Sequence, residues 1–293
     1  MRRSFAVLLL APVLAWAAMP TPAEVRALWR PSEARLLDRH GVLLESVRVD
    51  LQARRGSWVP LADISPALGA AVLQAEDQRF MQHGGIDLRA AGQAAWDNLF
   101  RRRPRGASTI TMQLAGLLDP GLRAAKDGRS WPQKFDQALA ARELEAGWSK
   151  AQILEAYLNL VTFRGELQGV GAASHALFGK APSGLDVAES TILAALLRAP
   201  SARPKQVAQR ACQLAAELKS ATGCPAIEWR AAVALARSGS VGKPGAPQAF
   251  GQGKPPATGP GRHLRRRQSF GLQAQRRERR AQFMGGVGDE APL

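Results

Sequence analysis

The sequence predicts a mostly α-helical domain that begins with a short β-hairpin. Residues 35–50 alternate apolar and polar side chains around His40-Gly41, a pattern typical of two strands joined by a tight turn. Apolar side chains at helical spacing dominate the chain after this hairpin. With 293 residues, 46% of them apolar, the chain can bury a sizeable core, which excludes a wholly disordered protein.

The individual helices follow from apolar spacing and from capping signals. Ala67–Phe80 and Ile86–Phe100 are the first two expected helices, and Trp96 and Leu99 lie on the apolar stripe of the second. Two later helices are expected to start with a capping box, in which Ser or Asp is followed three residues later by Gln or Glu. The pairs are Ser149 with Gln152, before a helix through Leu160, and Asp186 with Glu189, before a helix that stops ahead of Pro200. Between these two helices, a turn is predicted by Gly165, Gly169 and Gly171.

The two ends of the chain differ in composition from the part between them. Residues 1–22 place Arg2-Arg3 before a short apolar stretch, which predicts an export signal, either cleaved or retained as a membrane anchor. Residues 238–293 are rich in Gly and Pro and hold ten Lys or Arg against three Asp or Glu, so we expect a disordered basic tail. A shifted reading frame in a GC-rich gene would give the same composition.

Charge and cysteine content narrow the function classes. The net charge of +16 favours an anionic partner, which could be nucleic acid, phospholipid headgroups or a phosphate-bearing substrate. Export from the cytoplasm argues against nucleic acid. Two cysteines, Cys212 and Cys224, cannot make a disulfide-rich scaffold and do not have the spacing of a zinc site. Outside the cytoplasm they could pair with each other.

Residues with catalytic potential gather first in EDQRFMQHGG, residues 76–85. Glu76 and Asp77 stand at the end of an expected helix, where the helix dipole disfavours acids, so their placement points to function rather than stability. Burial beside Leu73 and Phe80 would disfavour the charged form of Glu76 and bring it toward the strength of a general base. The alternative is an ordinary surface glutamate, which is the commoner case for a lone Glu.

Two later segments add ligand-binding groups. Ser108, Thr109 and Gln113 offer hydroxyl and amide groups that suit a hydroxylated or phosphorylated ligand, although a Ser/Thr helix cap would look the same. Lys134 and Gln137 fall on one face of a further helix, where a cation and an amide project together.

Taken together and in order, these motifs resemble the peptidoglycan glycosyltransferase family of class A penicillin-binding proteins, most of all its penicillin-binding protein 1C subgroup. The resemblance spans roughly residues 35–203. The segments that carry it are EDQRFMQHGG, GASTITMQL, KFDQALAARELEAGWSKAQILEAYLN, LQGVGAASHALFGK and AESTILAALLRAPS.

The resemblance implies a lysozyme-like, mostly α domain over residues 23–203. It implies polymerisation of lipid II into β-1,4-linked glycan strands at the periplasmic side of the cytoplasmic membrane. It assigns Glu76 as the general base of an inverting transfer, and Lys134 to the diphosphate of the lipid donor. A diphosphate leaves as a stable anion and needs cations rather than an acid, which agrees with these roles. The substrate-binding residues that it implies are Asp77, Phe80, His83, Ser108, Thr109, Gln113, Lys134 and Gln137.

The partners that the resemblance implies are lipid II, the growing glycan strand and other cell-wall enzymes. No cofactor is required by it, except that a divalent cation, Mg²⁺ or Mn²⁺, could assist. Three positions depart from the family pattern. Gln137 stands where a second glutamate is usual, and Gly116 and Gln133 replace basic residues. These departures leave open a degenerate member that only binds lipid II or acts as a scaffold, and a lysozyme-like lytic enzyme is a further alternative.

A transpeptidase domain is not expected in this chain. Its nucleophile lies in a Ser-x-x-Lys motif, and here that pattern occurs as Ser240-Val241-Gly242-Lys243 within the basic tail. We therefore predict no β-lactam binding. Residues 204–237 are interpreted as a helical linker remnant.

Overall fold

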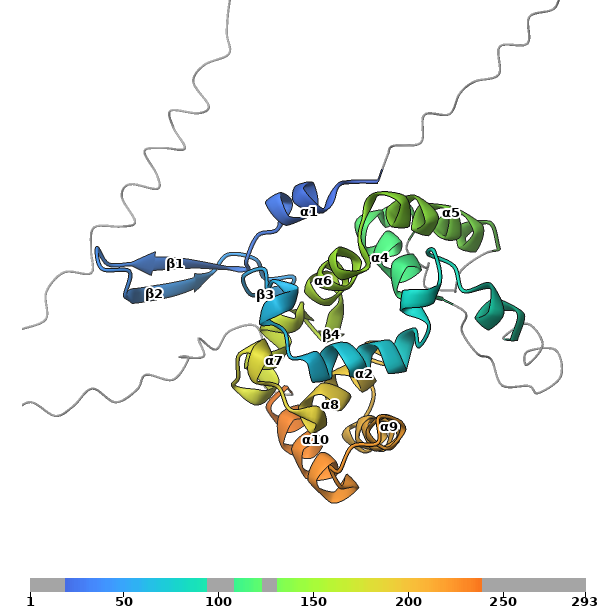
Figure 1. Ribbon diagram of the computed structural model, residues 1–293. Coiled ribbons are helices and arrows are strands. Elements are labelled where there is room, and N and C mark those ends of the chain that lie inside the picture. Colours follow the sequence, from blue (N-terminus) through green and yellow to red (C-terminus); the bar gives the residue numbers. More distant parts are fainter. Residues whose placement is uncertain (1–18, 94–107, 123–130, 239–293) are drawn as a thin grey trace, which may run out of the picture. The chain divides into compact units, whose positions relative to one another are not determined.

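The computed structural model describes residues 19–93, 108–122 and 131–238 (Figure 1). It confirms the predicted fold class, because helices dominate and one antiparallel hairpin stands near the N-terminus. Most of the expected export segment and nearly all of the expected tail, including Ser240 and Lys243, lie outside the described residues.

The hairpin forms where the alternating pattern predicts it. After the short helix α1 (Pro22–Leu28), strand β1 (Glu33–Leu37) pairs antiparallel with β2 (Leu43–Arg48). The Asp38 carboxylate closes the turn by accepting hydrogen bonds from the backbone N–H groups of His40 and Val42, each at 2.8 Å. Gly41 has a φ of +80°, which glycine adopts without steric cost.

The first expected helix is shorter than its apolar pattern. Helix α2 (Pro66–Glu76) ends at Glu76, and the residues up to Phe80 leave the helix. Asp77 has an extended φ of −160°, and a separate 3₁₀ turn, η2 (Phe80–Gln82), follows. The early end has a physical cause: the Asp77 side chain turns away to bond Ile110 N–H, which lies far along the chain.

The second expected helix begins at Leu88, two residues later than predicted, and Gln93 is the last described residue of that segment. Asp87 precedes it and accepts a hydrogen bond from Ala90 N–H at 2.9 Å, as an N-cap does. Trp96 and Leu99, expected on its apolar stripe, lie outside the described residues.

The central helices are α4 (Ile110–Leu118), α5 (Trp131–Gly147), α6 (Lys150–Leu160) and α8 (Val187–Arg198), and the 3₁₀ turn η3 (Pro120–Leu122) follows α4. Both predicted capping boxes are confirmed. Ser149 and Gln152 cap α6, and Asp186 and Glu189 cap α8, each through reciprocal side-chain and backbone hydrogen bonds. The α8 helix ends before Pro200, as expected.

The glycine-rich segment is more than the predicted turn. Strands β4 (Thr162–Arg164) and β5 (Leu167–Gln168) form a small hairpin, and β5 also pairs in parallel with β3 (Arg54–Arg55). Gly169 has a φ of +82°, and a Cβ atom there would lie 2.5 Å from the Asn159 carbonyl oxygen. Only glycine fits, so this residue lets the chain turn directly into α7 (Val170–Phe178). Two further 3₁₀ turns are η1 (Leu61–Asp63) and η4 (Pro182–Gly184).

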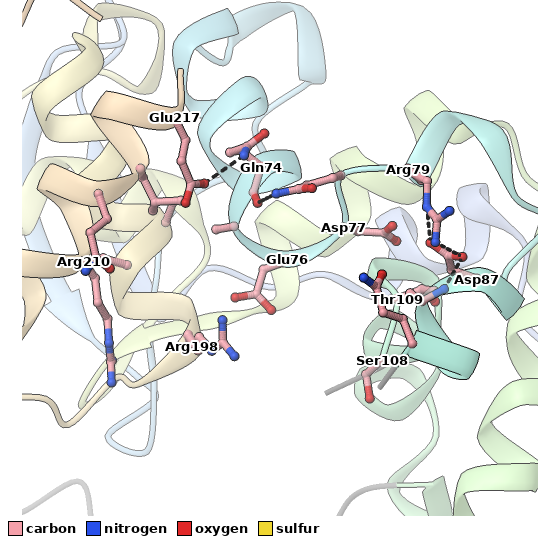
Figure 2. Close-up of a pocket in the computed structure, with 18 residues that line it drawn as sticks. Gln74, Glu76, Asp77, Arg79, Asp87, Ser108, Thr109, Arg198, Arg210 and Glu217 are labelled. Atoms are coloured by element: carbon pink, nitrogen blue, oxygen red, sulfur yellow. Dashed lines mark hydrogen bonds and ion pairs between the residues drawn. The ribbon is translucent and has the colours of Figure 1, made fainter. Parts of the chain in front are cut away.

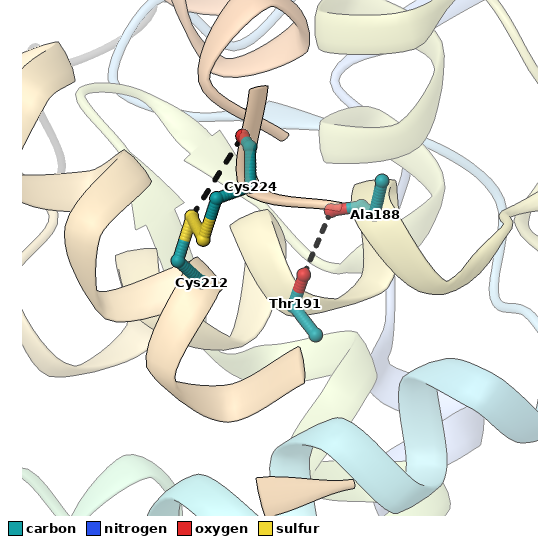
Figure 3. Close-up of a disulfide and its surroundings, with 4 residues drawn as sticks. All are labelled: Ala188, Thr191, Cys212 and Cys224. Atoms are coloured by element: carbon teal, nitrogen blue, oxygen red, sulfur yellow. Dashed lines mark hydrogen bonds between the residues drawn. A yellow bond between two sulfur atoms is a disulfide. The ribbon is translucent and has the colours of Figure 1, made fainter. Parts of the chain in front are cut away.

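Residues 204–237, expected as a helical linker remnant, form two helices that pack on the same core. Helix α9 (Pro204–Glu217) packs on α8 and α2, and α10 (Cys224–Ser238) packs on α9, α8 and α7 (Figure 1). A disulfide joins Cys212 in α9 to Cys224 at the start of α10, with a Cα–Cα distance of 5.3 Å (Figure 3). Buried Val207, Ala211 and Ile227 belong to the one hydrophobic cluster that also contains Leu68 and Ile192.

Among the helices of residues 19–93, 108–122 and 131–238, none has both the length and the apolarity needed to cross a membrane.

Candidate active site

A groove of about 680 Å³ opens beside the C-terminal end of α2. One wall comes from the end of α2, the turn that follows it and the residues just before α4. The opposite wall comes from α8 and α9, through Ala194, Ala195, Arg198, Arg210, Gln213, Leu214 and Glu217. Figure 2 shows Glu76 between these walls, with its carboxylate directed toward the Arg198 side chain. The C-terminal end of α2, which the sequence predicts as a site, therefore faces the groove.

Only one of the two oxygen atoms of the Glu76 carboxylate accepts a hydrogen bond from the described residues. Its Oε2 accepts a hydrogen bond from Gln113 Nε2 at 3.1 Å, whereas its Oε1 is buried and has no hydrogen-bond partner among the described residues. Burial raises the pKa of the Glu76 carboxyl above its ordinary value, and nearby Asp77 adds to this. The hydrogen bond from Gln113 and the positive charge of Arg198 act in the opposite direction. A carboxylate with a raised pKa and one unbound oxygen is suited to accept a proton.

A buried relay fixes the orientation of Gln113. Tyr157 donates its hydroxyl hydrogen to Gln113 Oε1 at 2.9 Å, which leaves the Gln113 amide nitrogen to face Glu76. Burial, together with the negative charge of Glu76, raises the pKa of the Tyr157 phenol, so this hydroxyl stays a donor. The sequence marks Gln113 but gives no sign of Tyr157, whose role depends on α6 crossing α4.

Asp77 joins the first two motifs. Only 7% of its surface is exposed, and its carboxylate accepts from Ile110 N–H at 3.0 Å and from His83 Nε2 at 2.9 Å. An acid at the first N–H of a helix is favoured by the helix dipole, so Asp77 anchors α4 beside the end of α2. Asp77 lines the groove, whereas His83 does not.

Two further predicted residues sit in the interior. Phe80 is 1% exposed, and Lys150 Nζ lies 4.3 Å from the centre of its ring. The same ammonium donates to the His83 carbonyl oxygen at 2.6 Å and to Glu145 at 2.7 Å. Phe80 and His83 thus shape the turn that carries Glu76. Lys150 was not singled out by the sequence, because its contacts join segments that are far apart in the chain.

The hydroxyl residues before α4 divide into two roles. Thr109 is the N-cap of α4, accepting from Met112 N–H at 3.1 Å, and donates to the Gly85 carbonyl oxygen at 2.6 Å. It is nearly inaccessible, which favours the helix-cap interpretation that the sequence left open. Ser108 is half-buried and lines the groove beside Thr109.

Lys134 and Gln137, expected on one face of α5, lie in different environments. Lys134 is exposed, whereas Gln137 is 0% exposed and both of its amide atoms lack a hydrogen-bond partner within the described part of the chain. Neither belongs to the residues that line the groove described above. A Cβ atom on Gly116 would lie 2.8 Å from Gln137 Nε2. Gly116 and Gln137, two of the three positions that the resemblance marks as departures, are therefore neighbours.

Within the described residues, Asp77, His83 and Asp87 have ligand atoms that all lie within 4.8 Å of one another. The carboxylates of this group nevertheless already accept hydrogen bonds from the protein. Asp77 is engaged as described above, and Asp87 accepts two hydrogen bonds from the Arg79 guanidinium, at 2.7 and 2.9 Å. A divalent cation would have to displace that guanidinium and would lie close to its charge. The residues present therefore do not fit a Mg²⁺ or Mn²⁺ ion at this place.

Comparison with known proteins identifies a family for most of the described residues. The family described as Transglycosylase matches residues 40–219, more than half of the chain. The chain belongs to the transglycosylase family. The match includes α9 and so passes residue 203, where the domain was expected to end.

Curated relatives of this transglycosylase come from two groups. Proteins described as biosynthetic peptidoglycan transglycosylase, from Salmonella typhi and Pectobacterium atrosepticum, are 43% and 42% identical over 144 residues. These alignments cover 49% of this chain and 57% of each relative. Penicillin-binding protein 1C of Escherichia coli is 40% identical over 161 residues, which cover 53% of this chain and 20% of that protein. The chain thus spans little more than half the length of the biosynthetic relatives.

Proposed function

We propose that the protein is a peptidoglycan glycosyltransferase that polymerises lipid II into β-1,4-linked glycan strands. The relatives described as biosynthetic peptidoglycan transglycosylase support a role in peptidoglycan synthesis. The observation that carries the proposal is the Glu76 carboxylate, which lines a groove, has a raised pKa and keeps Oε1 unbound. The expected export segment and the basic composition support a position at the outer face of the cytoplasmic membrane, where lipid II and the growing strand are the partners.

In the proposed reaction, Glu76 acts as the general base. Its carboxylate takes the proton of the acceptor's 4-hydroxyl while that oxygen attacks the anomeric carbon of the donor. The bond between this carbon and the lipid diphosphate breaks, the diphosphate leaves with the bonding electrons, and the configuration inverts. As the resemblance implies, we assign Lys134, an exposed residue outside the lining of the groove, to the leaving diphosphate. Ser108, which lines the groove, is assigned to the sugar hydroxyls. Asp77, Phe80, His83, Thr109 and Gln113 would position these groups through the contacts described above. Gln137 is fully buried, and both of its amide atoms lack a hydrogen-bond partner among the described residues.

The groove favours transfer from a diphosphate over cleavage of a sugar–sugar bond. Most glycosidases use a second carboxyl group to protonate or stabilise their reacting atoms. The acid beside Glu76 is Asp77, and its oxygens already accept from a backbone N–H group and from His83. A diphosphate needs no such acid, because it leaves as a stable anion.

Two alternatives have distinct outcomes. The raised pKa of Glu76 would also suit the acid of a lysozyme-like lytic enzyme, which would release anhydro-muropeptides from isolated sacculi. A degenerate member that only binds lipid II or acts as a scaffold for other wall enzymes would bind it without turnover, equally well with Glu76→Gln.

The test is polymerisation of labelled lipid II by the purified full-length chain. Wild type should form glycan polymer, and Glu76→Gln should reduce the rate by about 10²-fold or more, since general-base catalysis contributes on that order. The matched control is Glu228→Gln, which removes an exposed carboxylate on α10 outside the groove. If folded wild type forms no polymer, or if Glu76→Gln retains the wild-type rate, the proposed activity is wrong.

A further inference from the structure

We infer that Arg198 and Arg210 form a diphosphate-binding subsite on the α8–α9 wall of the groove. This inference rests on the proposed function for the identity of the substrate, and it assigns binding residues on the side of Glu76 opposite α4. The sequence singled out neither arginine, and Arg210 lies in the segment interpreted as a linker.

Some of the charged side chains that line the groove have a partner within the protein and others do not. The Arg79 guanidinium is neutralised by Asp87, and Glu217 accepts a hydrogen bond from Gln74 Nε2 at 2.8 Å. Arg198 and Arg210, by contrast, have no ion-pair partner among the described residues. The α8–α9 wall therefore carries two arginines without an ion-pair partner among the described residues, beside one carboxylate, Glu217, whose bonded partner is a neutral amide.

Arg210 carries the clearest sign of a missing partner. Its Nη1 atom is buried and has no hydrogen-bond partner in the described part of the chain. A guanidinium hydrogen that is withdrawn from water and left unbonded costs free energy, unless a ligand accepts it. Because Arg210 lines the groove, an anion that enters there can supply the acceptor.

Arg198 lies on the reaction side of the same wall. Its positive charge lowers the pKa of Glu76 without an ion pair between them, so it is close to the carboxylate but remains available to another anion. Figure 2 shows the Arg198 side chain beside Glu76 and Arg210 further along the α9 side. An anion between the two arginines would be placed next to the proton acceptor.

A diphosphate fits this arrangement better than a single carboxylate. Guanidinium groups bind phosphate oxygens through paired, charge-assisted hydrogen bonds, so two arginines that line one groove offer donors to each of two linked phosphates. The packing of α9 on α8 fixes the relation between the two arginines. In the proposed reaction, the diphosphate is that of the donor or of the acceptor lipid II.

The test measures binding of inorganic diphosphate to the full-length chain by calorimetry, without lipid II. Arg198→Gln and Arg210→Gln should each weaken binding about tenfold or more, as loss of a charged hydrogen bond does. Lys205→Gln, which removes an exposed cation from the same helix outside the groove, should leave it unchanged. Arg210→Lys keeps the charge and should retain part of the affinity, which separates loss of a contact from loss of folding.

Two further arms identify the ligand. A disaccharide–pentapeptide that lacks the diphosphate should bind wild type and both arginine variants equally. If its binding falls with the arginines, they recognise a carboxylate and the inference is wrong. It is also wrong if wild type binds no diphosphate or if both variants bind it as tightly as wild type.

In the polymerisation assay, Arg198→Gln and Arg210→Gln should each increase KM for lipid II. Such an increase would identify the diphosphate of the acceptor or donor lipid II as the natural ligand. A chain that binds diphosphate but forms no polymer would refute the proposed function alone. Polymerisation with unaltered diphosphate affinity in the variants would refute the subsite alone.

Discussion

Replacement of Gln113 by methionine should shift the pH dependence of catalysis in a defined direction. The Gln113 amide donates to Glu76 Oε2 at 3.1 Å and thereby lowers the pKa of this carboxyl, against the larger effect of burial. Methionine has a similar volume but no donor, so the pKa of Glu76 should rise further. Because a general base acts only when ionised, the acidic limb of the pH profile should move to higher pH.

The size of this shift follows from the strength of the bond. A hydrogen bond to a charged group contributes about 1.5–3 kcal/mol. Since one pKa unit corresponds to about 1.4 kcal/mol, full loss would shift the limb by about one to two pH units. Glu76 is only partly buried and water can replace some of the lost bond, so we expect a shift of about one unit.

The assay is kcat/KM for lipid II polymerisation, measured across the acidic range. Gln209→Met, an exposed position on α9, provides the matched control and should leave the profile unchanged. Gln113→Met also removes the acceptor of the Tyr157 hydroxyl and leaves that buried hydroxyl without a hydrogen bond. Adding Tyr157→Phe should therefore restore part of the free energy of unfolding, while the acidic limb of the pH profile stays shifted. An unshifted limb, or one displaced to lower pH, would refute the role given to Gln113 and Glu76.

Three other predictions concern stability. Cys212→Ser with Cys224→Ser should lower the free energy of unfolding by about 3 kcal/mol, as loop entropy predicts for a sequence separation of 12 residues, and equal urea midpoints with and without reductant in wild type would contradict this. Gln137→Glu should destabilise the fold increasingly as pH rises, because burial raises the folded-state pKa of the new carboxyl. Adding Gly116→Lys should reduce this loss of stability, since a side chain at residue 116 would lie next to residue 137. A loss of stability that does not depend on pH would contradict the prediction. Gly169→Ala should lower the melting temperature by several degrees, since its methyl group would lie 2.5 Å from a carbonyl oxygen.

Features set by neighbouring residues could be predicted from the sequence. The hairpin depends on alternation around His40-Gly41, and the starts of α6 and α8 depend on pairs three residues apart. Glu76 could be predicted as a site because its helix position is unfavourable for an acid, and the structure places it in the groove.

Features that join distant segments could not be predicted in the same way. The parallel pairing of β3 with β5 joins Arg54 to Leu167, and no local pattern marks either strand. The end of α2 was placed too late because Asp77 leaves the helix to bond Ile110, a contact invisible in the apolar periodicity. For the same reason the helices predicted for residues 204–237 could not be placed: α9 packs its amphipathic face on the core, and its Arg210 lines the groove.

The central claim is that Glu76 activates an acceptor hydroxyl for transfer from a lipid diphosphate. The most direct measurement counts glycosidic bonds formed and lipid diphosphate released from labelled lipid II in the same reaction. We predict one diphosphate released for each bond formed by wild type, and loss of both products with Glu76→Gln. Bonds formed without diphosphate release, diphosphate released without polymer, or both products persisting in Glu76→Gln would contradict it.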